Sequence, residues 1–194
     1  MKKPTRFAAI AAVLVVHVAA FAWLIGRFER IVTDGTECRF PCSAYDPADP
    51  FRGRYLRMSV DLQFPISHEE AMNYWGERRW KRPLAVKIDS TGGADGLSRV
   101  VALARKPTDD GLWVRKCPVR LERGTYDTAW VKFPNQYFLN ENLAAGGERL
   151  LRSNATNCVA VYRVRDGSIV LTGIEVNGRR IEDAIREMEP LPAR

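Results

Sequence analysis

The sequence predicts a mainly β protein, an antiparallel β-sandwich or open barrel with one or two short helices, that follows an N-terminal transmembrane helix. Three observations lead to this prediction. Residues 7–26 form an apolar run without a formal charge, residues 55–64 alternate apolar and polar side chains, and Asp166-Gly167 separates two further apolar runs. About seven or eight short strands with turn residues between them are typical of an all-β domain.

Length and charge set limits on the chain. Its 194 residues leave room for one domain and an appendage. The formal net charge is +7, but the first thirty residues hold five Lys or Arg and one Glu, so more than half of the excess lies there. The remainder is only mildly basic, which argues against a nucleic-acid partner.

The N-terminal apolar run is long enough to cross a bilayer. Its twenty residues, at a rise of about 1.5 Å each, span about 30 Å, which matches the hydrocarbon thickness. Lys2, Lys3 and Arg6 precede the run, and the flank that follows it carries less positive charge. The positive-inside rule therefore predicts a single-pass anchor through residues 7–26, with a cytoplasmic N-terminus and the remaining chain outside the cytoplasm.

A cleaved signal peptide is the alternative interpretation of this run. Ala20-Phe21-Ala22 has the small-x-small form that precedes a cut, here before Trp23. The apolar run is longer than the usual signal-peptide core of about 7–15 residues, which favours an uncleaved anchor.

The chain is then expected to have three parts. Residues 1–30 form a basic tail and the anchor, residues 31–44 form a linker that contains two cysteines, and residues 45–194 form an extracytoplasmic β-rich domain. No internal repeat divides the domain further.

Four cysteines make an even count outside the cytoplasm, which favours disulfides. Three pairings are possible, and we expect Cys38–Cys42 and Cys117–Cys158, because the second pair lies on predicted strands that are far apart in the sequence. A zinc site built from all four thiols is the alternative. Structural zinc sites usually bring two close cysteine pairs, and this chain has only one, so we expect no metal.

A proline-punctuated turn leads into the first predicted strand. Pro47 and Pro50 fix the backbone before Gly53. One parity of residues 55–64 is then apolar and the other polar, the pattern of a half-buried strand. Its basic residues form either an ordinary solvated face or a small anion-facing edge; these residues are Arg52, Arg54 and Arg57.

The remaining elements follow from local patterns. Ser67 and Glu70 have the spacing of a capping box, which predicts a short helix to about residue 74. The strand over residues 97–104 is apolar on both faces, so we expect it to be central and to form a hairpin with residues 112–121. The other expected elements are strands over 84–89, 128–133, 158–165 and 168–176 and helices over 141–153 and 179–189.

Catalytic residue patterns are weak in this chain. His68-Glu69-Glu70 is a catalytic-looking cluster, but it lacks the H-E-x-x-H spacing, and acids are common in the first turn of a helix. A serine–lysine dyad of Ser59 and Lys87 on neighbouring strands would make a hydrolase. Nothing in the spacing requires this dyad, so we expect no catalytic residue and no cofactor.

The stretch from Asp46 to Val60 resembles the signature of the GDYXXLXY family of bacterial membrane-anchored proteins. Gly53 and Tyr55 match that signature, whereas Arg54 replaces its Asp, Met58 its Leu and Val60 its final Tyr. Residues 133–139 and 160–178 are similar to two further blocks of the family. The resemblance spans most of the chain after the anchor.

The resemblance implies location and architecture. It places the chain in the bacterial inner membrane, and relatives are often encoded beside a multi-spanning membrane protein. We therefore expect a non-enzymatic accessory or interaction domain for another membrane or envelope protein. The candidate interaction residues are Arg52, Gly53, Arg54, Tyr55, Arg57, Gln136 and Tyr137.

Two further expectations concern where these residues lie. The first two blocks of the signature should lie together, with Tyr55 near Gln136 and Tyr137. The alternative function is a module that binds a small ligand, lipid or glycan. That alternative predicts a concave pocket lined by aromatic side chains such as Tyr55, Tyr74, Trp75 and Tyr137.

Overall fold

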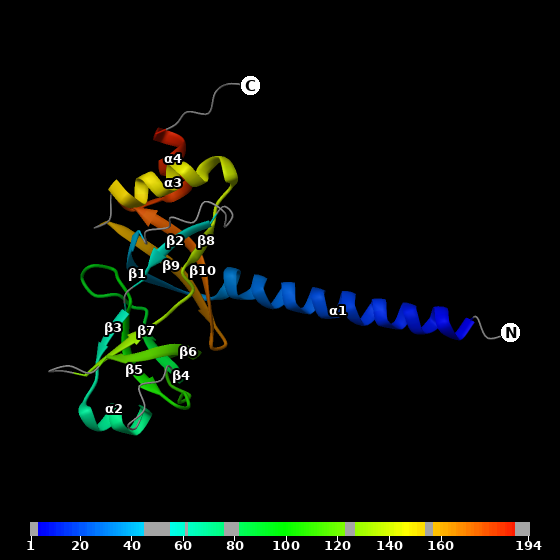
Figure 1. Cartoon of the computed structure of the whole chain (residues 1–194), viewed down its shortest axis with the longest axis horizontal. Coiled ribbons are helices and arrows are strands. Elements are labelled where there is room, and N and C mark those ends of the chain that lie inside the picture. Colours follow the sequence, from blue (N-terminus) through cyan, green and yellow to red (C-terminus); the bar gives the residue numbers. More distant parts are fainter. Residues whose placement is uncertain are drawn as a thin grey trace.

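A computed structural model describes residues 4–44, 55–60, 62–75, 82–122, 127–153 and 157–188. These residues form a mainly β domain with a long N-terminal helix that projects from it (Figure 1). In chain order the elements are α1 (Pro4–Asp34), β1 (Thr36–Ala44), β2 (Tyr55–Ser59), β3 (Leu62–Pro65), α2 (His68–Trp75), β4 (Arg82–Asp89), β5 (Arg99–Ala104), β6 (Leu112–Glu122), β7 (Thr128–Val131), β8 (Gln136–Phe138), α3 (Glu141–Ser153), β9 (Cys158–Arg165), β10 (Ser168–Val176), β11 (Arg179–Arg180) and α4 (Ile181–Met188).

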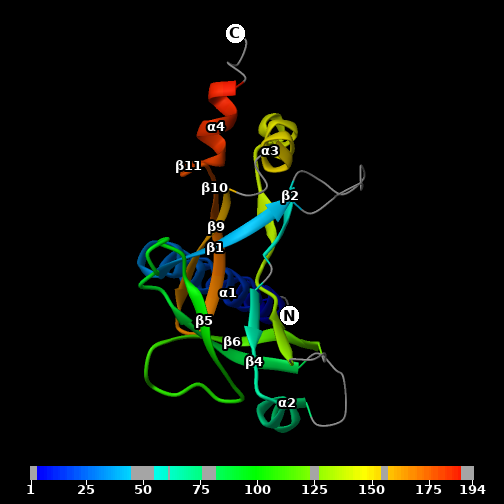
Figure 2. The ribbon, with the colours of Figure 1, turned by 90° about the vertical axis from the view of Figure 1, so that its left-hand side faces the viewer.

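The strands form two antiparallel sheets, which confirms the predicted fold class. The six-stranded sheet has the order β11-β10-β9-β1-β2-β8, and the five-stranded sheet has the order β3-β7-β6-β4-β5. The first sheet curls until β8 lies near β10, so it approaches an open barrel. Helices α3 and α4 lie at one end of the molecule and α2 lies at the other (Figure 2).

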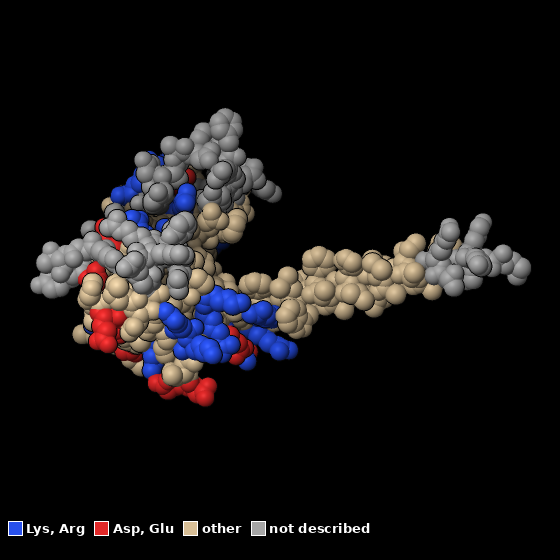
Figure 3. Space-filling view, turned by 60° about the horizontal axis from the view of Figure 1, so that its bottom comes forward, with Lys and Arg blue, Asp and Glu red and all other residues tan. Residues whose placement is uncertain are grey.

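Helix α1 is longer than the predicted anchor. The helix over residues 7–34 contains an apolar stretch long enough to cross a membrane, with its charged residues confined to 27–34, and the projecting part shows almost no charged side chain (Figure 3). The helix does not stop at residue 26 but continues into the domain, where Ile31 is 3% exposed. Arg165 forms an ion pair of 2.6 Å with Asp34, and the Gly35 N–H donates to the Ile31 carbonyl. The final turns of α1 are therefore part of the domain's packing.

Residues 36–44, expected to be a linker, form the central strand β1. This strand pairs with β9 from Thr36↔Val164 to Cys42↔Cys158. The side chains of Cys38, Phe40 and Cys42 are buried on one parity, as in a strand with one face on the core.

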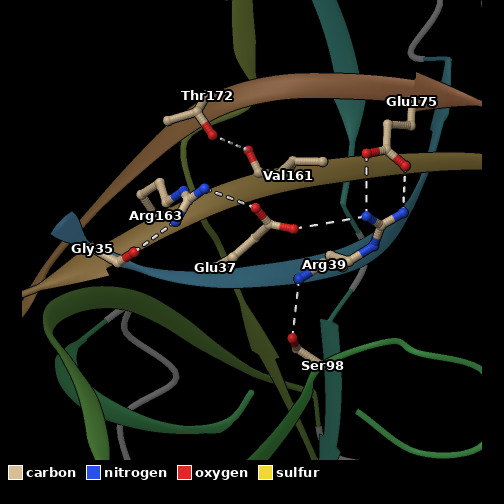
Figure 4. Close-up of polar contacts among 8 residues, drawn as sticks. All are labelled: Gly35, Glu37, Arg39, Ser98, Val161, Arg163, Thr172 and Glu175. Carbon is tan, nitrogen blue, oxygen red and sulfur yellow. Dashed lines mark hydrogen bonds and ion pairs between the residues drawn. The ribbon is translucent and has the colours of Figure 1, made fainter. Parts of the chain in front are cut away.

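Polar side chains on the other parity of β1 join three strands (Figure 4). Glu37 accepts from Arg163 at 3.0 Å and lies 3.7 Å from Arg39, and Arg39 makes a two-point contact with Glu175 on β10. The Arg39 backbone also bonds Ser98 in both directions, at 2.8 and 3.0 Å. Because Ser98 precedes β5, this contact links the first sheet to the second.

The predicted strand over residues 55–64 is divided between the two sheets. Strand β2 pairs with β1 and β8, whereas β3 pairs with β7 of the other sheet. The alternation continues across the crossing, since Leu56, Met58, Val60 and Leu62 are all buried. The alternation of apolar and polar side chains over residues 55–64 was therefore predicted correctly, but one strand was expected where two exist.

The expected hairpin between residues 97–104 and 112–121 is wrong. Strand β4 lies between β5 and β6 and pairs with both of them, which leaves β5 at the edge of its sheet. The apolar residues on both faces of β5 suggested a central position, but Val101, at 45% exposed, points to solvent.

Local turn and cap signals predicted their elements well. Asp166 and Gly167 have φ values of 52° and 77°, as a type I′ turn requires, and β9 and β10 flank them. The capping box of α2 is present, because the Ser67 N–H donates to Glu70 and the Glu70 N–H donates to the Ser67 hydroxyl, both at 3.2 Å.

An aromatic cluster lies at the centre of the core. Phe40, Phe133 and Tyr162 have ring centroids 5.5 to 6.0 Å apart in tilted and edge-on arrangements. The buried Tyr162 donates its hydroxyl to the Pro134 carbonyl at 2.7 Å. This bond fixes the segment between β7 and β8 against β9.

We expect Tyr162→Phe to lower the free energy of unfolding by about 1 kcal/mol, because the Pro134 carbonyl loses its donor. Tyr162→Ala should cost about 3–5 kcal/mol, because it also removes the ring from the aromatic cluster. Urea titration of the full chain in detergent, followed by tryptophan fluorescence, measures both values. Equal costs for the two variants would show that the hydroxyl, not the ring, supplies the stability.

Candidate functional site

The first two signature blocks lie side by side, as expected. Strand β2 carries the first block and β8 the second, and they pair with Tyr55 opposite Phe138, Leu56 opposite Tyr137 and Arg57 opposite Gln136. The predicted closeness of the two blocks is confirmed at the level of the backbone.

The predicted interaction residues have different surroundings. Arg52, Gly53 and Arg54 lie outside the described residues, as does the side chain of Tyr55. Arg57 and Gln136 are exposed on adjacent strands. Tyr137 is half-buried and donates its hydroxyl to Glu182 of α4, and burial raises the pKa of this phenol. Tyr137 therefore attaches β8 to α4, whereas the side chains of Arg57 and Gln136 lie at the surface.

A pocket of about 320 Å³ lies beside the signature strands, and we call it the motif pocket. Arg57 and Lys132 bring positive charge to it, and no Asp or Glu is among its described lining residues. The Trp130 indole Nε1 is buried and has no hydrogen-bond partner within the described structure. The full lining is Arg57, Met58, Ser59, Val60, Trp130, Val131, Lys132, Phe133 and Asn135.

The chemistry of the motif pocket suits a group that accepts hydrogen bonds. A buried N–H without an acceptor costs free energy, and an incoming carbonyl or carboxylate would satisfy it. Two cations at the same pocket favour a negatively charged acceptor. Trp130, Lys132 and Asn135 were missed by the sequence analysis. Asn135 lies inside the block of residues 133–139, and Trp130 and Lys132 lie just before it, which was the available signal, but the orphaned N–H arises only from tertiary packing.

The residues suggested for a hydrolase do not form a dyad. Ser59 lies at the end of β2 in one sheet and Lys87 lies on β4 in the other. Lys87 instead forms an ion pair of 2.5 Å with Asp110, and this hydrogen bond holds the pKa of Asp110 down to about 2. The expectation that Ser59 and Lys87 occupy neighbouring strands is wrong.

His68 has one acidic partner. Its Nδ1 lies 3.0 Å from Asp127, whose carboxylate is buried while the imidazole is largely exposed. Glu70, from the same short cluster, caps the helix through Ser67. The cluster therefore stabilises the start of α2.

The aromatic residues of the ligand-binding alternative do not gather in one place. Tyr74 on α2 donates to the Leu103 carbonyl of β5 at 2.8 Å, at the five-stranded sheet, whereas Tyr137 contacts α4 at the other sheet. The side chains of Tyr55 and Trp75 lie outside the described residues.

The four cysteines are buried thiols in this structure. Cys38 and Cys42 are four residues apart on the extended strand β1, a separation of about 13 Å, which is beyond the reach of a disulfide. Cys42 instead lies directly opposite Cys158. The described residues contain no cluster of three or more His, Cys, Asp or Glu side chains that could hold a metal ion.

Burial keeps these thiols protonated at neutral pH. It raises the pKa of Cys42 and of Cys117 to about 12 and that of Cys38 to about 11. Cys158 also has a raised pKa from burial. Protonated, buried thiols are poor nucleophiles, so the cysteines are suited to a structural rather than a catalytic role.

The fold and pocket define a β-rich domain carried on an N-terminal helix that is apolar and long enough to cross a membrane. The family model described as GDYXXLXY protein matches residues 17–174, which include most of the helix and both signature strands. The chain belongs to the GDYXXLXY family. No curated protein and no solved structure matches the chain.

We expect oxidative refolding of the full chain to join Cys42 to Cys158. Directly opposed residues of antiparallel strands have Cα atoms about 4.5–5.5 Å apart, within the range of disulfides. Each thiol gives up its proton, and the two electrons reduce the disulfide of oxidised glutathione. In the chain-entropy model the bridge should raise the free energy of unfolding by about 3–5 kcal/mol.

Peptide mapping after alkylation of the remaining thiols identifies the bridge. Cys42→Ser should remove it without creating a Cys38–Cys158 bridge, because Cys38 lies opposite Tyr162. A dominant Cys117–Cys158 peptide would contradict this pairing.

Proposed function

We propose that this protein is a single-pass protein of the bacterial inner membrane whose extracytoplasmic β domain binds another membrane or envelope protein through the motif pocket. Its role is that of an accessory or interaction domain without catalysis. The observation that carries the proposal is the buried Trp130 N–H on β7, which has no partner in the described structure, at a pocket that Arg57 and Lys132 also line beside the signature strand β2.

The proposed anchoring rests on the continuity of α1. The helix runs without a break through Ala20–Ala22, where a signal peptide would be cut, and its last turns pack into the domain. The basic residues at the N-terminus favour a cytoplasmic start, and the domain then lies on the opposite side of the membrane.

The proposed binding surface combines a rigid edge with a polar pocket. Exposed Arg57 and Gln136 stand opposite each other on β2 and β8, and Phe138 on the same strand is 74% exposed. Exposed aromatic and arginine side chains are enriched at protein interfaces, and the pocket that Trp130 lines would take an acidic or carbonyl group of the partner. The family resemblance, with relatives often encoded beside a multi-spanning protein, favours a membrane protein as that partner.

The anchor predicts how the native protein fractionates. We expect the full-length chain to stay in the membrane pellet after an alkaline carbonate wash, with the Met1 end intact by mass spectrometry. Protease added to spheroplasts should digest the domain and leave the cytoplasmic tail. A mature N-terminus at Trp23 would instead show that the apolar run is a cleaved signal peptide.

Substituting Trp130 tests the partner proposal. We expect Trp130→Phe to reduce crosslinked co-purification of a stoichiometric membrane protein about tenfold, because it removes one hydrogen bond to a charged acceptor. The measurement is quantitative mass spectrometry of a tagged purification from native membranes.

Trp113→Phe is the matched control, since the Trp113 N–H already donates to the Asp110 carbonyl at 2.7 Å within the chain. Trp130→Phe should leave the free energy of unfolding unchanged or raise it, because it deletes an unpaired buried donor. Loss of the partner with both variants would contradict the role of Trp130. The absence of any stoichiometric partner would contradict the proposed function and favour a small anionic ligand in the same pocket.

A further inference from the structure

A second pocket, of about 400 Å³, lies where α1 joins the domain, and we call it the anchor pocket. The last part of α1, strand β6, the segment after β7 and the start of β10 all contribute to it. Arg27 in its wall is the first charged residue after the apolar run of residues 7–26. When the helix spans a bilayer, this pocket lies at the level of the lipid headgroups.

The anchor pocket is strongly cationic. Arg27, Arg115, Lys116 and Lys132 line it, and no Asp or Glu is among its described lining residues. None of the four has a carboxylate within ion-pair distance in the described structure, whereas the neighbouring Asp166 is paired with Arg165. Figure 3 shows Lys and Arg side chains gathered beside the base of the projecting helix.

A bulge in β6 gathers two of these cations. Leu84 pairs with Cys117 and Val86 with Val114, so β6 carries one extra residue between these points. In a regular strand consecutive side chains point to opposite faces, but the one extra residue of a bulge lets two consecutive side chains lie on the same side. Arg115 and Lys116 are both exposed there, and Lys116 adopts the left-handed φ of 57°.

The turn between β9 and β10 closes the pocket around Arg115. The Arg115 N–H donates to the Gly167 carbonyl at 2.8 Å. A Cβ on Gly167 would lie 2.7 Å from the Arg115 Cγ, and Gly167 has a φ of 77°. Glycine at position 167 therefore allows the Arg115 side chain to pass over the turn and line the pocket.

The remaining wall of the anchor pocket is apolar and continues onto the membrane helix. Leu24 and Phe28 of α1 are 41% and 50% exposed, and Ile169 lines the pocket from β10. A soluble anion would be bound by the cations alone and would make no use of the apolar wall. A ligand with both a phosphate and an acyl chain uses the cations and this apolar wall together.

We propose that the anchor pocket binds an anionic phospholipid of the leaflet that faces the domain. Its phosphate contacts Arg27, Arg115, Lys116 and Lys132, and its acyl chains lie along Leu24 and Phe28 on α1. This inference rests on the membrane anchoring in the proposed function. The anchor pocket shares Lys132 with the motif pocket, but the inference does not require a protein partner there.

Native mass spectrometry of the full chain in detergent tests this proposal. The probes are phosphatidylglycerol, phosphatidylcholine and water-soluble glycerol phosphate at equal concentration. We expect retention of phosphatidylglycerol over phosphatidylcholine, and an Arg115→Gln/Lys116→Gln double variant should lower that retention about 25-fold, since each basic residue near a lipid surface contributes roughly fivefold.

Two further variants make the result specific. Lys132→Gln removes a pocket cation without altering the β6 bulge and should lower retention several-fold. Lys106→Gln/Arg186→Gln removes the same charge as the double variant at exposed positions outside the anchor pocket and should leave retention unchanged.

Three results would overturn the proposal. The first is equal retention of the two lipids by the unmodified chain. The second is unchanged retention in both the double variant and Lys132→Gln. The third is competition by glycerol phosphate as strong as that by phosphatidylglycerol, which would assign a soluble phosphorylated ligand. Because the assay uses purified protein, its failure is distinguishable from failure of the fractionation test of anchoring.

Discussion

The pairing of β1 with β9 is the contact on which the arrangement of this protein depends. It joins residues 36–42 to residues 158–164, so the strand that follows α1 is held by the β9–β10 hairpin. On the core side this pairing buries Phe40 and Tyr162, and on the other side it carries the ion pairs of Glu37, Arg39 and Arg163. Because β2 then adds to β1 and β8 to β2, the position of the signature strands follows from this one pairing.

Elements whose signals come from neighbouring residues in the sequence were predicted correctly. Predictions of strand pairing failed where the pairing depends on a strand far away in the sequence. The hairpin at Asp166-Gly167 and helix α3 were predicted within a residue, because turn chemistry and helical period are local properties. Residues 36–44 were expected to be a linker, since a single proline-containing strand has no local signal for its partner at 158–164. The order β6-β4-β5 was missed for the same reason, because alternation predicts a strand but not its neighbour.

The candidate site was predicted in part. The expected closeness of the two signature blocks came from the family resemblance, and the pairing of Arg57 with Gln136 bears it out. The candidate interaction residues differ in burial. Tyr137 is half-buried and contacts α4, while Arg57 is exposed. Trp130 could not be identified from the sequence, because an indole N–H without an acceptor is a property of the packed structure.

The motif pocket and the anchor pocket share one wall, the segment of Lys132 and Phe133. This segment is held from three directions. The Lys132 N–H donates to the Pro118 carbonyl at 3.0 Å, the Pro134 carbonyl accepts from Tyr162, and the Asn135 carbonyl accepts from the Met58 N–H at 3.1 Å. Coupling between two sites requires an element with two arrangements that both ligands bias. The wall is bonded to β6, β9 and β2 at once and is therefore held in one arrangement, so the proposed lipid would influence the proposed partner site only by orienting the domain on the membrane.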